Sequence, residues 1–420
     1  MSAPTTPPPL RNNCFALPAG VHWTPVDEAL ALLRERLVPV TGREKVPLSE
    51  AMGRVLADDV VAPRSNPPLC NTAVDGYGFG GGRSEGPHVL LLSKERAAAG
   101  PRLTSVVSQG HAVRILTGAA LPAGVDTVVL QEDVTVGDGQ IAFNGPIKTG
   151  ANTRRAGEDV QMGEIILKAG RRVTAADMAI LAATGTDQVD VRLPLRVAVI
   201  STGDELVEAG EIAQQDQIYD ANRPMLLSMI KAMGYTPVDM GRCTDDRAAL
   251  GRVLDEAADK ADVVLTSGGA SAGDEDHVSS LLTEAGAMQL WRIAIKPGRP
   301  LALGLWNNTP VFGLPGNPVA AMVCTLVFAC PAIAQLAGAG WVAPIGYEVP
   351  ANFTKSKKAG RREYLRARVH DGQAEVFESE GSGRISGLSW ADGLVELAED
   401  AQQINRGDLV RYVPFVSFSF

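Results

Sequence analysis

The chain has 420 residues, which at roughly 100–200 residues per domain indicates about three domains. Lys and Arg number 39 and Asp and Glu number 48, so the net charge is −9, which disfavours non-specific binding to nucleic acid or to an anionic membrane. The five cysteines form no C-x-x-C pair and the histidines are scattered. This argues against a disulfide scaffold or a zinc site and fits a reducing cytoplasm.

The N-terminal part of the chain combines a polar tail with one amphipathic helix. Residues 1–21 are rich in proline and lack the basic and apolar segments of a signal peptide, so we expect a flexible tail. Thr24 suits the N-cap of the helix that follows, and Pro25 suits its first position. Apolar residues at helical spacing predict one buried face, which consists of Val26, Leu30, Leu33 and Leu37.

Between residues 60 and 155 the sequence is typical of a small β-rich module. Short apolar runs there alternate with glycine, proline and asparagine. We expect strands at 89–92, 112–116, 127–130 and 140–143, and then a helix over 174–184 that Gly185 ends.

From residue 195 strands and helices alternate, which predicts a parallel sheet covered by helices on both faces. In such sheets ligands bind at the carboxyl ends of the strands. The apolar stretch 319–336 contains Cys, Thr, Pro and Gln, and predicts a buried core helix rather than a membrane span. The expected strands are 196–200, 235–240, 262–266, 301–305 and 311–314, and the expected helices are 222–233, 245–258 with Asp245 as its cap, and 276–285.

The helical pattern ends near residue 341. Strand-like runs at 364–369, 374–377 and 410–416 are separated by glycine-rich turns. They predict a small all-β domain at the C-terminus.

Three glycine-rich loops each follow an expected strand of the sheet, at 201–206, 266–276 and 313–318. Glycines let the backbone approach a bulky ligand, and free N–H groups at a helix N-terminus suit a phosphate or another oxyanion. Pro315 and Pro318 stiffen the third loop. Each loop alone is also compatible with a plain turn or a helix cap, so each is a weak signal by itself.

Acidic residues recur in glycine-punctuated loops, including two outside the sheet, at 71–77 and 154–159. Carboxylates and phosphate oxygens are the ligands that a hard cation such as Mg²⁺ prefers. Lys296 and Arg299 offer positive charge to an anionic ligand. The residues therefore predict a phosphate-bearing ligand with a hard divalent metal. The acidic candidates are Asp75, Asp159, Glu205 and Asp276.

The whole ordered set of motifs resembles the molybdopterin molybdenumtransferases, a family that includes the C-terminal half of gephyrin. Six or more motifs in one order are far more specific than any one of them. They span roughly residues 22–413, nearly the whole chain. The matching segments are 71–77, 114–132, 154–159, 201–206, 266–276, 296–300, 314–318 and 381–384.

The resemblance implies a multidomain fold with α/β and β-rich parts. An elongated first domain would be split into segments 22–60 and 157–193, with the β-rich module 61–156 inserted between them. A three-layer αβα domain similar to the molybdopterin adenylyltransferase fold would cover 194–340, and a β-barrel-like domain 341–420. The family works as a homodimer, with its site between the αβ domain of one subunit and the inserted module of the other.

The family's functional positions carry over onto particular residues of this chain. Asp75 and Thr117 match residues that the partner subunit contributes to the cleft, and Asp159 matches a further acidic position there. Glu205 and Asp276 match the acidic residues of the αβ domain linked to metal-dependent turnover. Lys296 and Arg299 match positions that meet phosphate or molybdate. The residues that match the pterin–phosphate cradle are Ser267, Gly268, Gly269, Ser271, Pro315, Gly316, Asn317 and Pro318.

The resemblance also implies an activity, which is Mg²⁺-dependent insertion of molybdenum from molybdate into adenylyl-molybdopterin with release of AMP. Asp75 and Glu205 are the best candidates for a general base. A molybdopterin adenylyltransferase could hand over the substrate, and cofactor-maturation proteins could take the product; no nucleic acid or membrane is expected. Two alternatives stay open: the adenylyltransferase reaction itself, and a non-catalytic scaffold of the gephyrin type.

Overall fold

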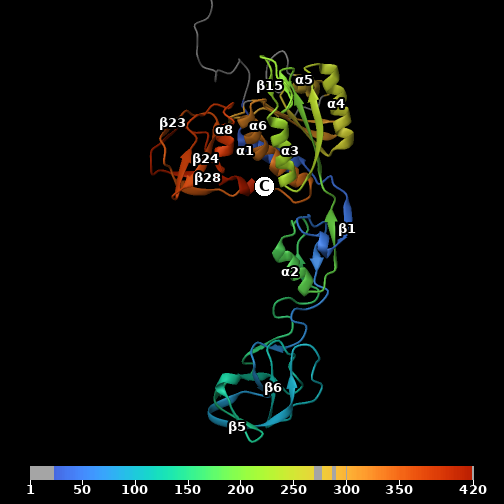
Figure 1. Ribbon diagram of the computed structural model, residues 1–420, viewed down its shortest axis with the longest axis vertical. Helices are drawn as coiled ribbons and strands as arrows, with labels where there is room; N and C mark the ends of the chain where they lie inside the picture. The colour runs from blue at the N-terminus through green and yellow to red at the C-terminus, as the bar shows by residue number, and fades with distance from the viewer. Residues whose placement is uncertain (1–22, 269–276, 286–289, 299, 419–420) are drawn as a thin grey trace, which may run out of the picture. The chain divides into compact units, whose positions relative to one another are not determined.

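The computed structural model describes residues 23–268, 277–285, 290–298 and 300–418, which fall into two compact units (Figure 1). One unit comprises residues 43–191, and the other joins the residues before 43 to those from 192 onward. The sequence-based division had put 22–60 in a single domain. Helix α1 (Val26–Arg36) instead packs Val26 and Ala29 into the core of the αβ domain, so residues 23–42 belong to that unit.

The first part of the 43–191 unit is a small core built on one helix and short strand pairs. Helix α2 (Ala175–Ala183) begins after Thr174, whose side chain forms a capping box with Asp177. The pairs are β1 (Arg43–Pro47) with β12 (Gln188–Arg192) and β2 (Val60–Val61) with β11 (Ile165–Leu167), and η1 (Leu48–Glu50) follows β1. The fully buried side chains include Leu56, Leu181 and Val191.

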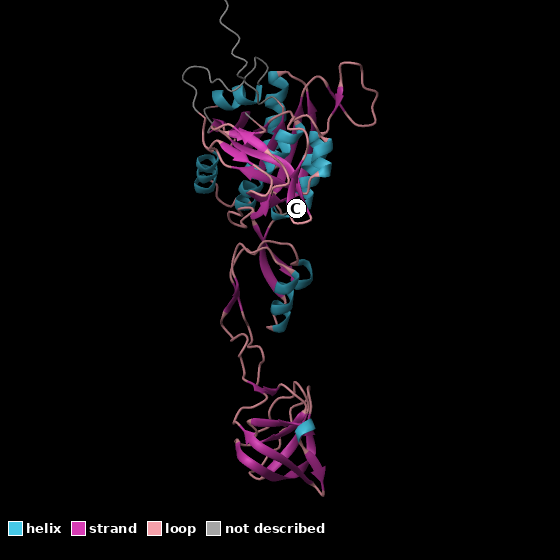
Figure 2. Cartoon of the chain, turned by 90° about the vertical axis from the view of Figure 1, so that its left-hand side faces the viewer, coloured by secondary structure: helices cyan, strands magenta, loops and turns pink. Residues whose placement is uncertain are grey.

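The second part of this unit is the predicted β-rich module, in which strands predominate (Figure 2). Its six-stranded sheet has the order β7-β4-β6-β5-β9-β8, and all four predicted strands are present. The strands are β4 (Gly76–Phe79), β5 (Arg83–Ala97), β6 (His111–Ile115), β7 (Thr127–Leu130), β8 (Thr135–Gly137) and β9 (Gln140–Ile147), with η2 (Gln131–Asp133) and a separate pair β3 (Asn71–Thr72) and β10 (Thr153–Arg154).

The αβ domain of the other unit is built on a six-stranded sheet with the order β16-β13-β17-β21-β20-β18. The first four strands are parallel, but β20 runs antiparallel to both of its neighbours, β21 and β18, so the prediction of a parallel sheet was wrong at this edge. Asn307 and Asn308, both with positive φ, close a hairpin between β20 and β21. The strands are β13 (Arg196–Thr202), β16 (Thr236–Cys243), β17 (Val263–Ser267), β18 (Leu290–Arg292), β20 (Pro300–Trp306) and β21 (Thr309–Leu314).

Helices cover both faces of this sheet and give the predicted three layers. One face packs against α1, α3 (Asn222–Ala232) and the long apolar helix made of α6 (Pro318–Cys324), the π-helical turn η3 (Thr325–Ala329) and α7 (Cys330–Leu336). The other packs against α4 (Arg247–Lys260) and α5 (His277–Glu284). The segment Pro318–Leu336 is long and apolar enough to cross a membrane, but 94% of its most apolar window is buried, as a core helix requires.

Two predicted helix caps are wrong by one residue. Pro25 is the N-cap of α1, because Thr24 forms an isolated β-bridge with Ile293 instead. Asp246 is the N-cap of α4, and its side chain accepts a hydrogen bond from the backbone of Ala249, whereas Asp245 lies one residue earlier. The elements themselves are confirmed.

The C-terminal domain is β-rich, as predicted, and one of its strands comes from the αβ segment. Its six-stranded sheet has the order β19-β24-β26-β28-β22, with β25 paired to β24. Strand β19 (Ile295–Lys296) runs parallel to β24 at one edge. The others are β22 (Tyr347–Pro350), β24 (Arg362–His370), β25 (Gln373–Val376), β26 (Gly393–Leu397) and β28 (Leu409–Pro414), with the pair β23 (Lys355–Lys357) and β27 (Gln402–Ile404), helix α8 (Ser386–Trp390) and η4 (Phe415–Phe418).

Candidate functional site

The parallel strands of the αβ domain end at one level and bring the three predicted loops together. Ser201 at the end of β13 is in register with Ser267 at the end of β17, and Ser267 is in register with Leu314 at the end of β21. The loops that follow therefore begin side by side at the carboxyl edge of the sheet. This is the edge where open αβ sheets bind ligands.

Gly268 is required by its close approach to the neighbouring strand. Its φ is +97°, and a Cβ there would lie 2.6 Å from the carbonyl oxygen of Thr202 and 2.7 Å from its hydroxyl. The backbone N–H of Gly268 also donates to the carbonyl of Leu314 at 3.2 Å. Only glycine permits this contact between three loops without strain.

The third loop is a rigid entry into the buried helix. Asn317 is the N-cap of α6 with φ −70° and ψ 126°, and Pro318 occupies the first helical turn. The Asn317 side chain makes no capping hydrogen bond and is exposed, as is Gly316. The loop therefore presents an amide side chain and a helix N-terminus at the carboxyl edge.

A residue that the sequence did not single out joins two of these loops. The side chain of Asn222, the first residue of α3, donates to the Ser267 hydroxyl at 2.7 Å and to the Gly316 carbonyl at 2.7 Å. Asn222 is buried, with 7% of its surface exposed. Its place at the start of the helix after the first glycine-rich loop was the one available signal.

Two of the predicted acidic residues belong to these loops. Glu205 is exposed and follows Gly203, and its carboxylate lies close to the Gly203 backbone. Asp276 lies outside the described residues, as do Gly269, Ser271 and Arg299, so their predicted roles stay predictions. Within the described ranges no three His, Cys, Asp or Glu side chains gather as a metal cluster. One exposed carboxylate still suits Mg²⁺, which keeps several waters and takes other ligands from substrate phosphates.

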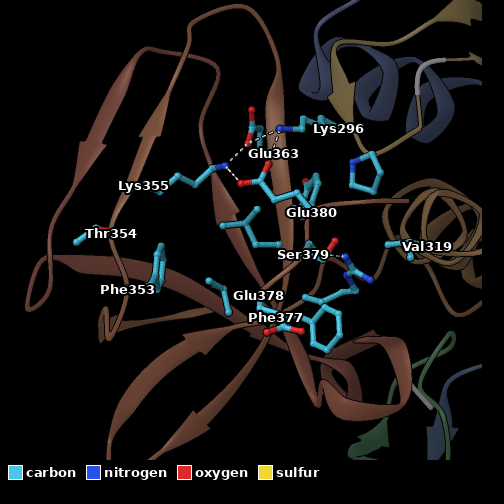
Figure 3. A pocket seen from close by; sticks show the side chains of 15 residues that line it. Lys296, Val319, Phe353, Thr354, Lys355, Glu363, Phe377, Glu378, Ser379 and Glu380 are labelled. Carbon is cyan, nitrogen blue, oxygen red and sulfur yellow. Dashed lines mark hydrogen bonds and ion pairs between the residues drawn. The ribbon is translucent and has the colours of Figure 1, made fainter. Parts of the chain in front are cut away.

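Lys296 lies in a charged pocket of about 160 Å³ beside the third loop (Figure 3). Its Nζ lies 2.8 Å from a carboxylate oxygen of Glu380 and 3.3 Å from one of Glu363. Lys355 contacts the same two carboxylates from β23. Pro297 and Val319 also line the pocket, which brings it next to the N-terminus of α6.

The charges in this pocket stabilise one another. Burial acts to lower the pKa of Lys355, but its hydrogen bond to Glu380 and the charge of Glu363 outweigh burial and raise that pKa. Burial acts in turn to raise the pKa of Glu380, and hydrogen bonds from Lys296 and Lys355 outweigh it and lower that pKa. Lys355 and Glu380 are therefore both ionised near neutral pH.

The loop 378–384 that carries Glu380 is held by a buried arginine. Arg366 donates to the carbonyls of Ser379, Gly381 and Arg384, and its guanidinium lies 4.9 Å from the centre of the Phe377 ring. The carbonyl of Ser382 accepts from the backbone N–H of Val319 in α6 at 3.2 Å. This loop therefore connects the C-terminal domain to the third loop of the αβ domain.

In the 43–191 unit the structure joins two predicted residues. One oxygen of Asp75 accepts from the Thr117 hydroxyl at 2.6 Å and from its backbone N–H at 2.7 Å. These two hydrogen bonds, the hydroxyl one first, lower the pKa of Asp75. Arg114 lies nearby and donates to Gln131 at 2.9 Å, while the Gln131 backbone donates to the Asp75 carbonyl. The pair is thus an ionised carboxylate with one oxygen already occupied.

Asp159 is exposed and has different neighbours. Its carboxylate accepts from the side chain of Asn66 at 2.8 Å, and its backbone N–H donates to the Asn66 carbonyl at 3.2 Å. No described hydrogen bond or ion pair links Asp159 to Asp75. The two acidic positions of this unit therefore form separate groups.

Comparison with known proteins agrees with this architecture. Residues 24–185 match the family model "MoeA N-terminal region (domain I and II)", 198–335 match "Probable molybdopterin binding domain", and 348–415 match "MoeA C-terminal region (domain IV)". A molybdopterin biosynthesis MoeA protein from Pyrococcus horikoshii has a similar structure, with a TM-score of 0.82 and 30% identity, covering 94% of this chain and 100% of its own.

Curated relatives cover nearly the same span. A molybdopterin molybdenumtransferase of Haemophilus influenzae is 35% identical over 93% of this chain and 98% of its own length. Molybdopterin molybdenumtransferase 2 of Mycobacterium tuberculosis is 35% identical over 86% of this chain and 92% of its own. A gephyrin of Dictyostelium discoideum is 27% identical over 94% of this chain and 62% of its own. The chain therefore belongs to the molybdopterin molybdenumtransferase family.

Proposed function

We propose that this chain completes the molybdenum cofactor by inserting molybdenum from molybdate into adenylyl-molybdopterin with release of AMP. The observation that carries the proposal is the convergence of three family loops at the carboxyl edge of the αβ sheet, where Gly268 has no room for a side chain. Relatives named molybdopterin molybdenumtransferase match nearly the whole chain, including the inserted module and the C-terminal domain. An enzyme that consisted of an adenylyltransferase-like αβ domain alone would need neither the inserted module nor the C-terminal domain.

The proposed reaction balances without a change in oxidation state. Two dithiolene thiols replace one oxo group of molybdate, which leaves with their two protons as water, and molybdenum stays hexavalent. Hydrolysis of the phosphoanhydride consumes one water and releases AMP. No nucleophilic side chain is needed, and the chain's task is to orient two anions and stabilise charge on the leaving phosphate.

The described residues fit different parts of this task. Ser267 and the backbone N–H groups near Asn317 would bind substrate phosphate at the carboxyl edge. Lys296 would offer positive charge to an oxyanion next to this edge if Glu380 moved away. Glu205, with Asp276, would hold Mg²⁺ together with phosphate oxygens, and the ion would offset negative charge on the phosphoanhydride.

We also propose that the enzyme is a homodimer in which Asp75 and Thr117 of one subunit complete the site of the other. Asp75 and Glu205 belong to different compact units of the chain, which is compatible with this arrangement. A mixture of Asp75→Asn and Glu205→Gln variants, unfolded and refolded together, should regain about a quarter of the wild-type activity. That figure holds because half of the dimers are mixed and each has one intact site. No regain would contradict the shared site.

The central test is chemical. Purified protein is incubated with adenylyl-molybdopterin, Mg²⁺ and molybdate, and AMP is measured by chromatography. We expect AMP release that depends on molybdate, and loss of release in the Glu205→Gln variant. A second incubation with molybdopterin and ATP should give no adenylyl-molybdopterin. Formation of the adenylate there would favour the adenylyltransferase reaction, and no AMP in the first incubation would favour a non-catalytic scaffold.

The setting of the reaction follows from its chemistry. An adenylyltransferase must supply the substrate, and a protein that accepts the finished cofactor must remove the product. The four cysteines in the described part of the chain are all unpaired, which fits the reducing cytoplasm, where we propose the enzyme works.

A further inference from the structure

Asn222 is a buried amide whose hydrogen bonds have a fixed direction. Its NH₂ group can only donate, and it donates to Ser267 Oγ and to the Gly316 carbonyl, both at 2.7 Å. These acceptors lie 45 and 94 residues away in the sequence, on two different loops. One side chain therefore holds the end of β17 and the third loop together.

The direction of the first bond fixes the role of the Ser267 hydroxyl. Because Ser267 Oγ accepts from Asn222, its own proton must point elsewhere. No described residue accepts that proton. Ser267 is 3% exposed and ends a strand at the carboxyl edge, next to the positive φ of Gly268. The hydroxyl is therefore oriented as a donor at the edge where a ligand would bind.

Some polar atoms around Asn222 have no hydrogen-bond partner among the described residues. The Asn222 Oδ1 and the Ser201 hydroxyl are buried and have no hydrogen-bond partner there. Ser201 pairs in register with Ser267 and is 0% exposed. Buried polar atoms without partners cost stability, so their presence in a folded protein calls for a reason beyond packing.

We propose that Asn222 is a positioning residue that presents the Ser267 hydroxyl as a hydrogen-bond donor to a phosphate oxygen of the bound substrate. The inference rests on the proposed function and deepens it, because it says which residue makes the Ser267 hydroxyl a donor rather than an acceptor. An aspartate at 222 has almost the same shape but the opposite polarity. Its carboxylate would accept the Ser267 proton and would face the Gly316 carbonyl without a hydrogen to share.

The test compares binding of adenylyl-molybdopterin, molybdopterin and AMP by titration calorimetry without molybdate. The variants are Asn222→Asp, Asn222→Ala, Ser267→Ala and the two double variants. Ser228→Ala is the matched control, because this exposed hydroxyl on α3 donates to the Pro224 carbonyl of its own helix and has no other hydrogen bond to a described residue. Thermal unfolding of each variant shows whether it folds.

At pH 7.5 we expect Asn222→Asp and Ser267→Ala each to weaken binding of adenylyl-molybdopterin about tenfold or more, as loss of a hydrogen bond to a charged group does. In the Ser267→Ala background, either change at Asn222 should weaken binding less than about threefold further. Adenylyl-molybdopterin contains two phosphates, one of which is also present in AMP and the other in molybdopterin. Only the compound whose phosphate contacts Ser267 should bind more weakly to the variants. Ser228→Ala should bind like the wild type.

The pH dependence distinguishes polarity from simple structural damage. A buried carboxyl facing a carbonyl has a raised pKa, so the Asn222→Asp side chain should become protonated as the pH falls toward 5, which restores one donor hydrogen where the amide has two. Its affinity relative to the wild type should therefore recover in part, while that of Asn222→Ala should not. If Asn222→Asp does not fold, Asn222→Ala and its cycle with Ser267→Ala decide the matter.

Several outcomes would overturn the proposal. They are affinities within twofold of the wild type for the Asn222 variants, full additivity with Ser267→Ala, and a wild type that binds none of the three compounds. Failure of the proposed function is a separate result. A wild type that binds adenylyl-molybdopterin with the expected coupling, yet releases no AMP with molybdate, leaves the positioning role intact and removes only the reaction.

Discussion

Replacement of Gly268 by alanine should strongly destabilise the carboxyl edge of the αβ sheet. The added Cβ would lie 2.6 Å from the Thr202 carbonyl oxygen, which is backbone and cannot rotate away. The φ of +97° adds a conformational cost of about 1–3 kcal/mol for a residue with a side chain. Overpacking against a fixed neighbour costs a further ~1–3 kcal/mol.

The sum has a central value of about 4 kcal/mol in the free energy of unfolding. For a unit of this size each kcal/mol lowers Tm by about 2–4 °C, so we expect a fall of about 8–16 °C. Differential scanning calorimetry of the protein without substrate measures this directly. Binding of adenylyl-molybdopterin to Gly268→Ala should also weaken, because relief of the contact must move one of the loops.

Gly316→Ala is the matched control on the neighbouring loop. Its Cβ would lie 3.7 Å from the Gly268 Cα, an ordinary contact, and its φ is not in the left-handed region. We expect its free energy of unfolding to change by less than about 1 kcal/mol. If Gly268→Ala melts within about 2 °C of Gly316→Ala, the steric reasoning behind this site is refuted.

Three further predictions concern charge and burial. The Arg362 side chain is 87% buried and makes a bidentate contact with Asp27 at 2.7–2.8 Å, which anchors α1 to the C-terminal sheet. Arg362→Ala should lower the free energy of unfolding by about 2–4 kcal/mol in chemical denaturation. A loss below ~0.5 kcal/mol would contradict this. Thr117→Val should raise the pKa of Asp75, as an NMR titration would measure. Because that pKa is lowered in the folded protein, the variant should be less stable than the wild type above the ordinary carboxyl pKa. The difference should vanish as the pH falls through the pKa of Asp75 in the folded protein. Burial raises the pKa of Cys324 to about 12, so mass spectrometry should find it unalkylated by iodoacetamide at pH 8 until denaturant is added.

The sequence by itself determined which elements form and where the ligand edge lies. Apolar periodicity identified five of the six strands of the αβ sheet but not β18, and parallel strands must bring their following loops to one edge. The family resemblance then fixed the fold class, because an ordered set of motifs constrains far more than any one loop. Local physics sufficed for the strands and for the ligand edge, since each depends on neighbouring residues and on strand direction.

The sequence predicted less where the structure depends on pairing between segments that are distant in the chain. Asn307 and Asn308, residues typical of a tight hairpin turn, reverse the chain and make this edge of the sheet antiparallel, which the alternation of strands and helices does not predict. Helix α1 has the amphipathic pattern that was predicted, but the pattern does not say which core will bury it. The phosphate contact of Lys296 stays a prediction, but the sequence did not indicate that its strand joins the C-terminal sheet or that its ammonium pairs with Glu380.

The tertiary structure alone decided how the loops are held. Asn222 reaches Ser267 and Gly316 across 45 and 94 residues, and no spacing rule connects such positions. Asp75 and Thr117, 42 residues apart, form one hydrogen-bonded pair, while Asp159 accepts from Asn66 instead. Local propensity is a property of neighbours along the chain, whereas a buried hydrogen bond depends on the packing of the whole core, so only the folded chain determines which donor finds which acceptor.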